Sequence, residues 1–192
     1  MSQRALFLDR DGTINFDPGY IKDPSQIVIL PGVAEGIRAL KHEFGFKIIV
    51  VSNQAGISKG LMTHSDVEAV NLRVNELLSA ENAGVDYFYY CPYHPDFDPP
   101  EKTNCRKPSP FMIVQASEEH NLDLQNSYMI GDKASDIESG LNAGVKTILL
   151  HGENIEKEIS TLLNLGKKPN FVAANFKEAC NFILKDLSGG VN

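Results

Sequence analysis

The fold is decided by residues 5–13, which read ALFLDRDGT: four apolar residues lead directly into two aspartates that flank an arginine. In extended backbone, residues two apart point the same way, so we expect Asp9 and Asp11 to project together while Arg10 turns aside. Gly12 lets the chain bend sharply after them. The stretch therefore predicts a buried strand that ends in two carboxylates at one spot.

Two carboxylates this close together predict a bound cation. Like charges at short range are unfavourable unless one carboxylate is protonated or a cation lies between them. A hard cation such as Mg²⁺ readily takes carboxylate oxygens as ligands. A pair of turn carboxylates after a strand is the simpler alternative for a single Asp-x-Asp-Gly sequence.

Short apolar runs alternate with segments of helical period along the rest of the chain, the pattern of βα units on a mostly parallel sheet. Strands are predicted at residues 5–8, 47–51, 85–90, 127–130 and 147–150. Helices are predicted at residues 33–44, after the N-cap Thr63, and at residues 111–120, 135–143 and 176–187. We therefore expect an α/β fold, doubly wound and Rossmann-like, with helices on both faces of the sheet.

Length and charge narrow the class of protein. A chain of 192 residues suits one domain, residues 1–192, and its 18 basic and 25 acidic residues give a net charge of −7. This charge opposes attraction to a phosphate backbone, so we expect no nucleic-acid partner. Apolar runs such as residues 48–51 are far shorter than the roughly 20 residues of a membrane span, so no membrane partner is expected. The amino terminus lacks a secretory signal pattern, and we expect a cytoplasmic protein.

A second acidic strand end occurs later in the chain, where residues 128–136 read YMIGDKASD. If the two strands are neighbours, Asp132 completes the cation site with Asp9 and Asp11. Asp136 would support that site from behind or cap the following helix. The alternative is that both acids are helix-start carboxylates favoured by the helix dipole.

Two further segments offer groups that can bind phosphate. The strand at residues 47–51 leads into SNQAG, where the Ser52 hydroxyl and free backbone amides suit a phosphate, although such a sequence is also typical of a turn. Arg106 and Lys107 follow a long loop, and one of these cations could neutralise a phosphoryl group; a solvated basic pair is the simpler alternative. In an open parallel sheet, loops that leave the carboxyl ends of strands gather at one rim, where ligands bind.

The order of these segments resembles the haloacid dehalogenase superfamily of phosphatases over about residues 4–150. The resemblance is closer to the heptose 1,7-bisphosphate 7-phosphatases, and it is carried by residues 9–15, 19–20, 52–57, 91–95, 105–108 and 131–133. It implies a Mg²⁺-dependent enzyme that hydrolyses the C7 phosphate of a small sugar bisphosphate through an aspartyl-phosphate, in the biosynthesis of nucleotide-activated heptose. We expect a monomer.

The resemblance also implies a role for each matching position. Asp9 is similar to the nucleophile, Asp11 to the general acid and base, and Ser52 and Lys107 to the groups that stabilise the phosphoryl group. Asp9, Asp11 and Asp132 resemble the Mg²⁺ ligands. The positions that resemble substrate contacts are Asp17, Pro18, Gly19, Tyr20, Ser52, Asn53, Gln54, Ala55, Arg106 and Lys133.

The three cysteines, Cys91, Cys105 and Cys180, form an odd and sparse set. Structural disulfides belong to oxidising compartments, so we expect reduced thiols or metal ligands. Members of the resembling family carry a zinc site, but two of its four ligand positions hold Tyr93 and Thr103 here. Structural zinc takes four ligands. Cys91, His94 and Cys105 supply at most three, so Zn²⁺ is doubtful and little zinc is expected.

Phosphatases of this superfamily often carry a cap domain, but only about eighteen residues separate Thr13 from the helix after Gly32, which is too few for one. We expect no separate cap domain and an open site. A histidinol-phosphate phosphatase is the nearest alternative, and Gly19, Tyr20 and residues 53–57 favour the heptose enzyme. A receiver-like, non-catalytic phosphate-binding module is a third possibility, against which Asp11 argues because a receiver needs no second acid.

Overall fold

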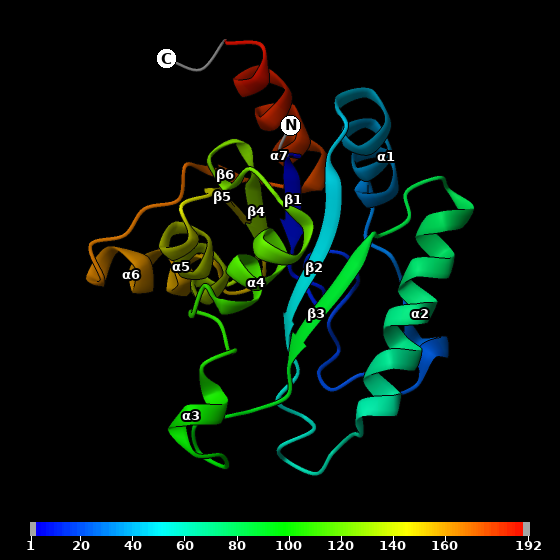
Figure 1. Cartoon of the computed structure of the whole chain (residues 1–192), viewed down its shortest axis with the longest axis vertical. Coiled ribbons are helices and arrows are strands. Elements are labelled where there is room, and N and C mark those ends of the chain that lie inside the picture. Colours follow the sequence, from blue (N-terminus) through cyan, green and yellow to red (C-terminus); the bar gives the residue numbers. More distant parts are fainter. Residues whose placement is uncertain (1–2, 190–192) are drawn as a thin grey trace.

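The computed structural model describes residues 3–189, which form a single six-stranded parallel sheet (Figure 1). The strand order is β3-β2-β1-β4-β5-β6, and the bounds are β1 Ala5–Leu8, β2 Lys47–Asn53, β3 Tyr87–Cys91, β4 Tyr128–Gly131, β5 Lys146–Leu150 and β6 Phe171–Ala173. Strand β1 pairs in parallel with both β2 and β4. The carboxyl ends of these three strands therefore lie side by side. The predicted doubly wound α/β fold is confirmed.

Helices cover both faces of the sheet. The helices on one face are α1 Val33–Phe44, α2 His64–Ala80 and α7 Phe176–Leu187, and those on the other are α4 Phe111–His120, α5 Ala134–Ala143 and α6 Ile155–Asn164. A short helix, α3 Pro100–Thr103, and two 3₁₀ turns, Pro24–Gln26 and Leu124–Asn126, lie in the connections. Figure 1 shows α3 in an excursion beyond the carboxyl edge of the sheet.

The alternation of side chains along β1 explains why both faces are covered. Leu6 and Leu8 join the core under α1, α2 and α7, whereas Ala5 and Phe7 join the core under α4. All four are fully buried. A strand that is apolar on both sides must be covered on both sides, which is the pattern of parallel sheets.

The predicted helices begin and end close to where their sequence signals stand. Helix α1 ends at Gly45, whose φ of 71° is favourable for glycine. Helix α2 begins after Thr63, which forms a capping box with Asp66. Helix α6 and strand β6 were not predicted from the sequence. Within residues 3–189, no helix is long and apolar enough to cross a membrane.

Candidate active site

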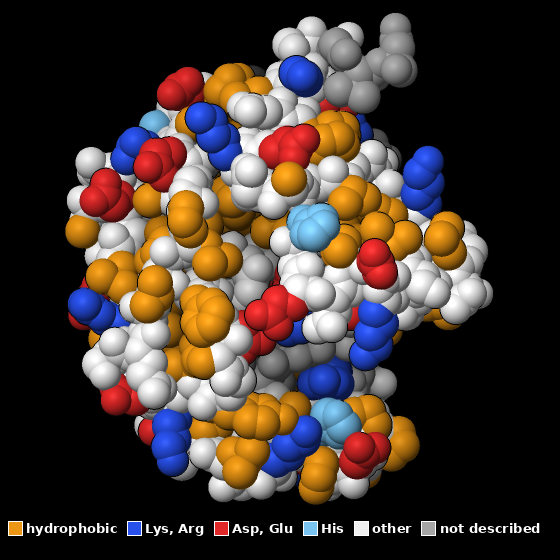
Figure 2. Space-filling view, turned by 180° about the vertical axis from the view of Figure 1, so that it is seen from behind, with side chains coloured by type: hydrophobic (Ala, Val, Ile, Leu, Met, Phe, Trp, Pro, Cys, Tyr) orange, Lys and Arg blue, Asp and Glu red, His pale blue; other side chains and the backbone are white. Residues whose placement is uncertain are grey.

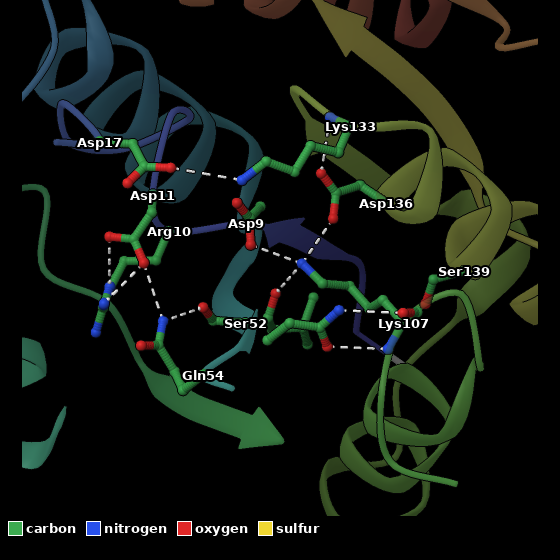
Figure 3. Close-up of polar contacts among 12 residues, drawn as sticks. Asp9, Arg10, Asp11, Asp17, Ser52, Gln54, Lys107, Lys133, Asp136 and Ser139 are labelled. Atoms are coloured by element: carbon green, nitrogen blue, oxygen red, sulfur yellow. Dashed lines mark hydrogen bonds and ion pairs between the residues drawn. The ribbon is translucent and has the colours of Figure 1, made fainter. Parts of the chain in front are cut away.

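The carboxyl ends of β1, β2 and β4 bring together the polar side chains that the sequence analysis selected (Figure 3). A pocket of ≈ 350 Å³ opens at this edge. The site residues that line it are Asp9, Asp11, Asp17, Gly19, Tyr20, Ser52, Asn53, Gln54, Ala55, Lys107, Lys133 and Asp136, and Ser135, which was not predicted, joins them. Asp132 lies in the wall of an adjoining pocket of ≈ 380 Å³ that shares Asp17 and Lys133 with the first.

Lys107 is the buried cation at the centre of the site. Its Nζ atom lies 2.6 Å from Asp9 Oδ1 and 2.7 Å from Asp136 Oδ1, and it also donates to the carbonyl oxygen of Val51 at 2.7 Å. The side chain is only 2% exposed. Burial opposes the charge, but the carboxylates of Asp136 and Asp9 outweigh it and raise the pKa of Lys107. Lys107 is therefore held as an ammonium ion against Asp9.

The backbone of Lys107 is held as firmly as its side chain. Asn53, at the end of β2, accepts from the Lys107 N–H at 3.0 Å and donates to the Lys107 carbonyl at 3.0 Å. Ser139 of α5 donates to the carbonyl of Ser109, two residues later, at 2.9 Å. The loop that carries Lys107 is thus bonded to the end of β2 and to α5.

Asp132 has the properties of a cation ligand. Its Oδ1 atom is buried and has no hydrogen-bond partner among the described residues. Burial, followed by the charges of Asp9 and Asp136, raises the pKa of Asp132 to about 8. Gly12 lies so close that a Cβ atom there would be 2.5 Å from Asp132 Oδ2, and its φ of 88° also favours glycine. An unpaired carboxylate in this position fits a divalent cation.

Asp9 and Asp132 meet as the sequence predicted, and Asp136 joins them. Oxygens of Asp9, Asp132 and Asp136 lie within 4.8 Å of one another. Burial and the charges of Asp136 and Asp11 raise the pKa of Asp9 to about 6, although Lys107 acts in the opposite direction. Asp136 already uses both of its oxygens, one on Lys107 and the other on the backbone N–H of Lys133 at 3.1 Å. This leaves Asp9 and Asp132 with the free oxygens that a metal needs.

The carboxylate of Asp11 is held apart from this acidic cluster. It accepts from Arg10 at both oxygens, at 3.0 and 2.8 Å, from Asn15 at 3.1 Å and from Gln54 at 2.9 Å. Burial opposes the charge of Asp11, but the guanidinium of Arg10 and these hydrogen bonds outweigh it and lower its pKa. The expectation that Arg10 turns aside is wrong, because the chain leaves extended conformation after Leu8 and the guanidinium folds back onto Asp11 (Figure 3).

Arg10 and Asn71 are polar residues of this region that the sequence analysis did not single out. Arg10 Nη1 donates to Asn71 Oδ1 of α2 at 2.8 Å. Gln54 was predicted as a substrate contact, and its amide donates to Ser52 Oγ at 2.7 Å as well as to Asp11. The Gln54 amide therefore links Ser52 to Asp11.

Of the remaining predicted substrate positions, some line the pocket and others do not. Lys133 Nζ lies 3.5 Å from Asp17 Oδ2, and the Tyr20 hydroxyl accepts from Lys59 at 2.8 Å. Arg106 is half-buried, donates to the carbonyl of Tyr93 at 3.4 Å and does not line the pocket. Pro18 lies in the same loop as Asp17 but does not line the pocket.

The cysteine loop differs from its prediction. Cys91 and Cys105 form a disulfide, with their Cα atoms 5.4 Å apart, whereas Cys180 is a free, buried thiol. The expectation of reduced thiols for this pair is therefore wrong. The number of cysteines and the expected compartment do not tell which thiols are neighbours in space. Here the end of β3 and the loop before Lys107 bring the sulfurs of Cys91 and Cys105 together. Two sulfurs in a disulfide offer no thiolate to Zn²⁺, and the Nδ1 of His94 accepts from the Asp96 backbone at 3.2 Å.

Comparison with known proteins agrees with this arrangement. A HAD-hydrolase-like family model matches residues 104–179. A D-glycero-D-manno-heptose-1,7-bisphosphate 7-phosphatase of Chlorobaculum tepidum is 44% identical over 165 residues, covering 81% of this chain and 82% of that protein. A D-glycero-beta-D-manno-heptose-1,7-bisphosphate 7-phosphatase of Yersinia pestis is 36% identical over 183 residues, covering 90% of this chain and 97% of that protein.

A solved structure extends the similarity to the fold. The crystal structure of D,D-heptose 1,7-bisphosphate phosphatase from B. bronchiseptica, complexed with magnesium and phosphate, superposes with a TM-score of 0.82 at 25% identity and covers 96% of this chain and 99% of that chain. With its parallel sheet, its convergent carboxylates and these relatives, the chain belongs to the heptose 1,7-bisphosphate 7-phosphatase family of the haloacid dehalogenase superfamily.

Proposed function

We propose that this protein is a Mg²⁺-dependent phosphatase that hydrolyses the C7 phosphate of D-glycero-manno-heptose 1,7-bisphosphate. The observation that carries the proposal is the contact of Asp9 with the buried ammonium group of Lys107, beside the unpaired Asp132. The relatives support the substrate, since proteins 44% and 36% identical to this chain bear that activity in their names. They favour it over histidinol phosphate.

The first step would transfer the phosphoryl group to Asp9. A carboxylate oxygen of Asp9 attacks phosphorus, the bond from phosphorus to the C7 oxygen breaks, and that oxygen takes a proton from Asp11. Lys107 offsets the repulsion between the attacking carboxylate and the phosphate, and Ser52 donates a hydrogen bond to a phosphate oxygen. The products of this step are the heptose 1-phosphate, with a free hydroxyl at C7, and an aspartyl-phosphate at Asp9.

The second step would restore the enzyme. A water oxygen attacks phosphorus, a proton of that water passes to Asp11, and the bond from phosphorus to the Asp9 oxygen breaks to release inorganic phosphate. Asp11 thus ends the cycle with the proton that it gave in the first step. Asp11 lies two residues from Asp9 yet stays outside the acidic cluster, which suits a group that exchanges protons with the leaving oxygen and with water.

Asp9 and Asp132 would hold the Mg²⁺, because their oxygens face one another and Asp132 Oδ1 is unpaired. Asp11 as a third ligand stays a prediction. Its carboxylate already accepts hydrogen bonds from Arg10, Asn15 and Gln54. Asp136 orients Lys107. When bound, Mg²⁺ would supply positive charge that offsets the repulsion between Asp9 and the phosphate.

The open mouth of the pocket suits a small, elongated substrate. Asp17, Gly19 and Tyr20, which line it, come from the connection between β1 and α1. Lys133 and Arg106 would provide positive charge for the second phosphate of a bisphosphate. That the active form is a monomer stays a prediction.

The direct test is phosphate release from both anomers of the heptose 1,7-bisphosphate, from histidinol phosphate and from p-nitrophenyl phosphate, with phosphorus NMR to show which phosphate leaves. We expect the heptose substrates to have a kcat/KM well above the others and the C7 resonance to disappear first. A higher kcat/KM for histidinol phosphate would replace the substrate assignment. A protein that becomes phosphorylated but does not turn over would instead be a receiver-like module.

A further inference from the structure

Arg10 lies between the two catalytic aspartates in the sequence, yet the proposed chemistry gives it no task. Its side chain is fully buried, and a buried guanidinium needs partners for its charge and its donors. Three of its nitrogens have one each: Nε and Nη2 donate to the two oxygens of Asp11 at 3.0 and 2.8 Å, and Nη1 donates to Asn71 at 2.8 Å. The guanidinium therefore joins Asp11 to α2.

Asn71 is a polar residue on the otherwise apolar buried face of α2. Val67, Val70, Val74 and Leu78 share this face, and Asn71 is only 8% exposed. Among the described residues, the side chain of Asn71 makes one hydrogen bond, which its Oδ1 atom accepts from Arg10. An apolar residue would pack at this position, so the amide serves to orient the guanidinium.

We propose that Arg10, oriented by Asn71, is a positioning residue that holds the Asp11 carboxylate for proton transfer. The inference rests on the proposed role of Asp11 as general acid and base. Two parallel N–H donors fix the plane of a carboxylate, which the single point charge of a lysine does not do. In Figure 3, Arg10 and Asp11 lie on one side of Asp9 and Lys107 lies on the other, so the two buried cations engage different carboxylates.

The other hydrogen-bond donors to Asp11 show how firmly its carboxylate would still be held without Arg10. Asn15 donates to Oδ1 and Gln54 to Oδ2, so the carboxylate would remain bonded but with half of its donors. Proton transfer needs a contact of about 2.6–3.2 Å. A displacement of about an ångström in a reacting group can cost about 100-fold in rate.

The test is Arg10→Lys, measured with two kinds of leaving group. With the sugar bisphosphate we expect kcat to fall by about 10- to 100-fold, with little change in KM, because the alkoxide leaving group needs a proton. With p-nitrophenyl phosphate the leaving group needs none, so the first burst of nitrophenolate should stay close to one per enzyme and close to the rate of the unaltered protein. The later turnover should be slow, since Asp11 also acts as the base, and phosphorylated Asp9 should accumulate.

Two controls separate this inference from the function on which it rests. In an Asp11→Asn background, Arg10→Lys should cause no further loss, since residues that act as a unit are not additive. Arg73→Lys, an exposed α2 position paired with Glu76, should change nothing. If Asp11→Asn itself turned over normally, the proposed function would fail. If only Asp11→Asn were slow while Arg10→Lys matched the unaltered protein, the function would stand and the positioning role would fall.

A second variant keeps the inference testable should Arg10→Lys fold poorly. Asn71→Leu leaves both partners of the ion pair in place and removes the hydrogen bond that orients the guanidinium, at a position whose neighbours on α2 are apolar. We expect the same pattern at a smaller size, a slowdown of about 3- to 10-fold with phosphorylated Asp9 accumulating. Turnover and burst both unchanged in Asn71→Leu would overturn the role of the α2 contact. Equal slowing of burst and turnover would indicate general loss of structure and overturn the inference.

Discussion

The Lys107 ammonium group lies between two carboxylates that come from different halves of the sheet. Asp9 follows β1, and Asp136 lies in the first turn of α5 after β4, so one cation fixes the distance between these two elements. Gly131 makes this contact possible, because a Cβ atom there would be 2.3 Å from the Cβ of Asp136. The geometry of the candidate site is therefore built by the ion pairs that join the end of β1 to α5.

Replacing Lys107 tests this double role. Lys107→Met would leave Asp9 and Asp136 buried without their cation, and breaking a buried pair in this way costs about 3–5 kcal/mol of unfolding free energy. We expect a loss of that size in urea unfolding with a chelator present, together with loss of turnover. Arg73→Met, at an exposed ion pair with Glu76 on α2, serves as the control and should change stability little. A stability loss below about 1 kcal/mol in Lys107→Met would contradict the role of this pair.

Asp9 tests the chemistry with the smallest possible change. Asp9→Asn keeps the size of the side chain but its amide cannot form an acyl-phosphate, so we expect no turnover and no phosphorylated protein by mass spectrometry. The amide oxygen can still accept from Lys107, so the thermal midpoint should stay near that of the unaltered protein. Asp23→Asn, at a capping residue of an exposed turn, is the control. Measurable turnover by a folded Asp9→Asn protein would sink the mechanism.

At the level of residues, the sequence predicted which groups meet but not how they bond. Asp9, Asp132, Ser52 and Lys107 converge because the ends of β1, β2 and β4 are adjacent, and strand neighbours follow from the pattern of βα units. The contact of the Arg10 guanidinium with Asp11 could not be predicted from the sequence, because side chains alternate in direction only while the backbone is extended. Side-chain direction in the turn after β1 depends on contacts with α2, 61 residues away in the chain.

At the level of elements, the helices and strands up to β5 were predicted apart from the short helix α3, whereas α6 and β6 were missed. The α4 and α7 bounds agree with their predictions. Helix α7 buries Phe176, Ala179, Cys180 and Ile183 along one stripe, whereas α4 buries Met112, Ile113 and Ala116 near its start and ends at Asn121, whose φ is 51°. Strand β6 has only three residues at the edge of the sheet, where alternation has no length in which to appear. Helix α6 did carry a signal, since Ile155, Ile159 and Leu162 recur at offsets of four and three and all pack against its core cluster.

The Cys91–Cys105 disulfide belongs to this scale, since it ties the end of β3 to the loop that delivers Lys107. Closing a loop with a sequence separation of 14 residues contributes about 3 kcal/mol by limiting the unfolded chain. We expect the Cys91→Ser, Cys105→Ser double variant to melt roughly 6–12 °C lower, at about 2–4 °C per kcal/mol for a protein of this size. Differential scanning calorimetry without reductant measures this.

The same variant supplies its own control for the effect of reduction. Dithiothreitol should lower the thermal midpoint and the activity of the unaltered protein, because Lys107 follows Cys105 by two residues, and should change neither in the double variant. Cys180 is a buried, free thiol in both proteins, so it does not contribute to the difference between their responses to dithiothreitol. An unaltered protein that ignores dithiothreitol, or a double variant that keeps the same midpoint, would show that the disulfide does not support this loop.

For the molecule as a whole, the net charge is negative, and positive charge at the candidate site comes from a few side chains. The chain carries a net charge of −7, and Figure 2 shows acidic and basic side chains interspersed over one face, without a continuous basic band. The cations of the site are few: Lys107 and Arg10 are buried beside Asp9 and Asp11, and Lys133 lines the pocket. A small anionic ligand can use such local charge, whereas a nucleic-acid backbone needs an extended basic surface.

The acidic cluster should make the stability of the whole protein depend on pH and on Mg²⁺. The pKa of Asp132 is raised to about 8 and that of Asp9 to about 6, both above the ordinary 3.8. Between pH 4 and pH 8 the folded chain therefore holds protons that the unfolded chain has released. The free energy of unfolding must then fall as the pH rises through this interval, because the folded state binds more protons.

We therefore expect the thermal midpoint, measured with a chelator, to fall from pH 5 to pH 8.5. Bound Mg²⁺ replaces those protons with a charge that stays, so its addition should raise the midpoint most at the upper end of the range, by about 2.7 kcal/mol of unfolding free energy at 100 times Kd. Affinity for Mg²⁺ should increase with pH, and binding near pH 7 should release protons that calorimetry in buffers of different ionisation enthalpy can count. Asp132→Asn should weaken both effects and raise the Mg²⁺ needed for turnover, whereas Asp123→Asn, which caps an exposed 3₁₀ turn, should leave them unchanged. A chelated protein whose midpoint is flat or rises across this range, with Mg²⁺ affinity independent of pH, would place the metal away from Asp9 and Asp132.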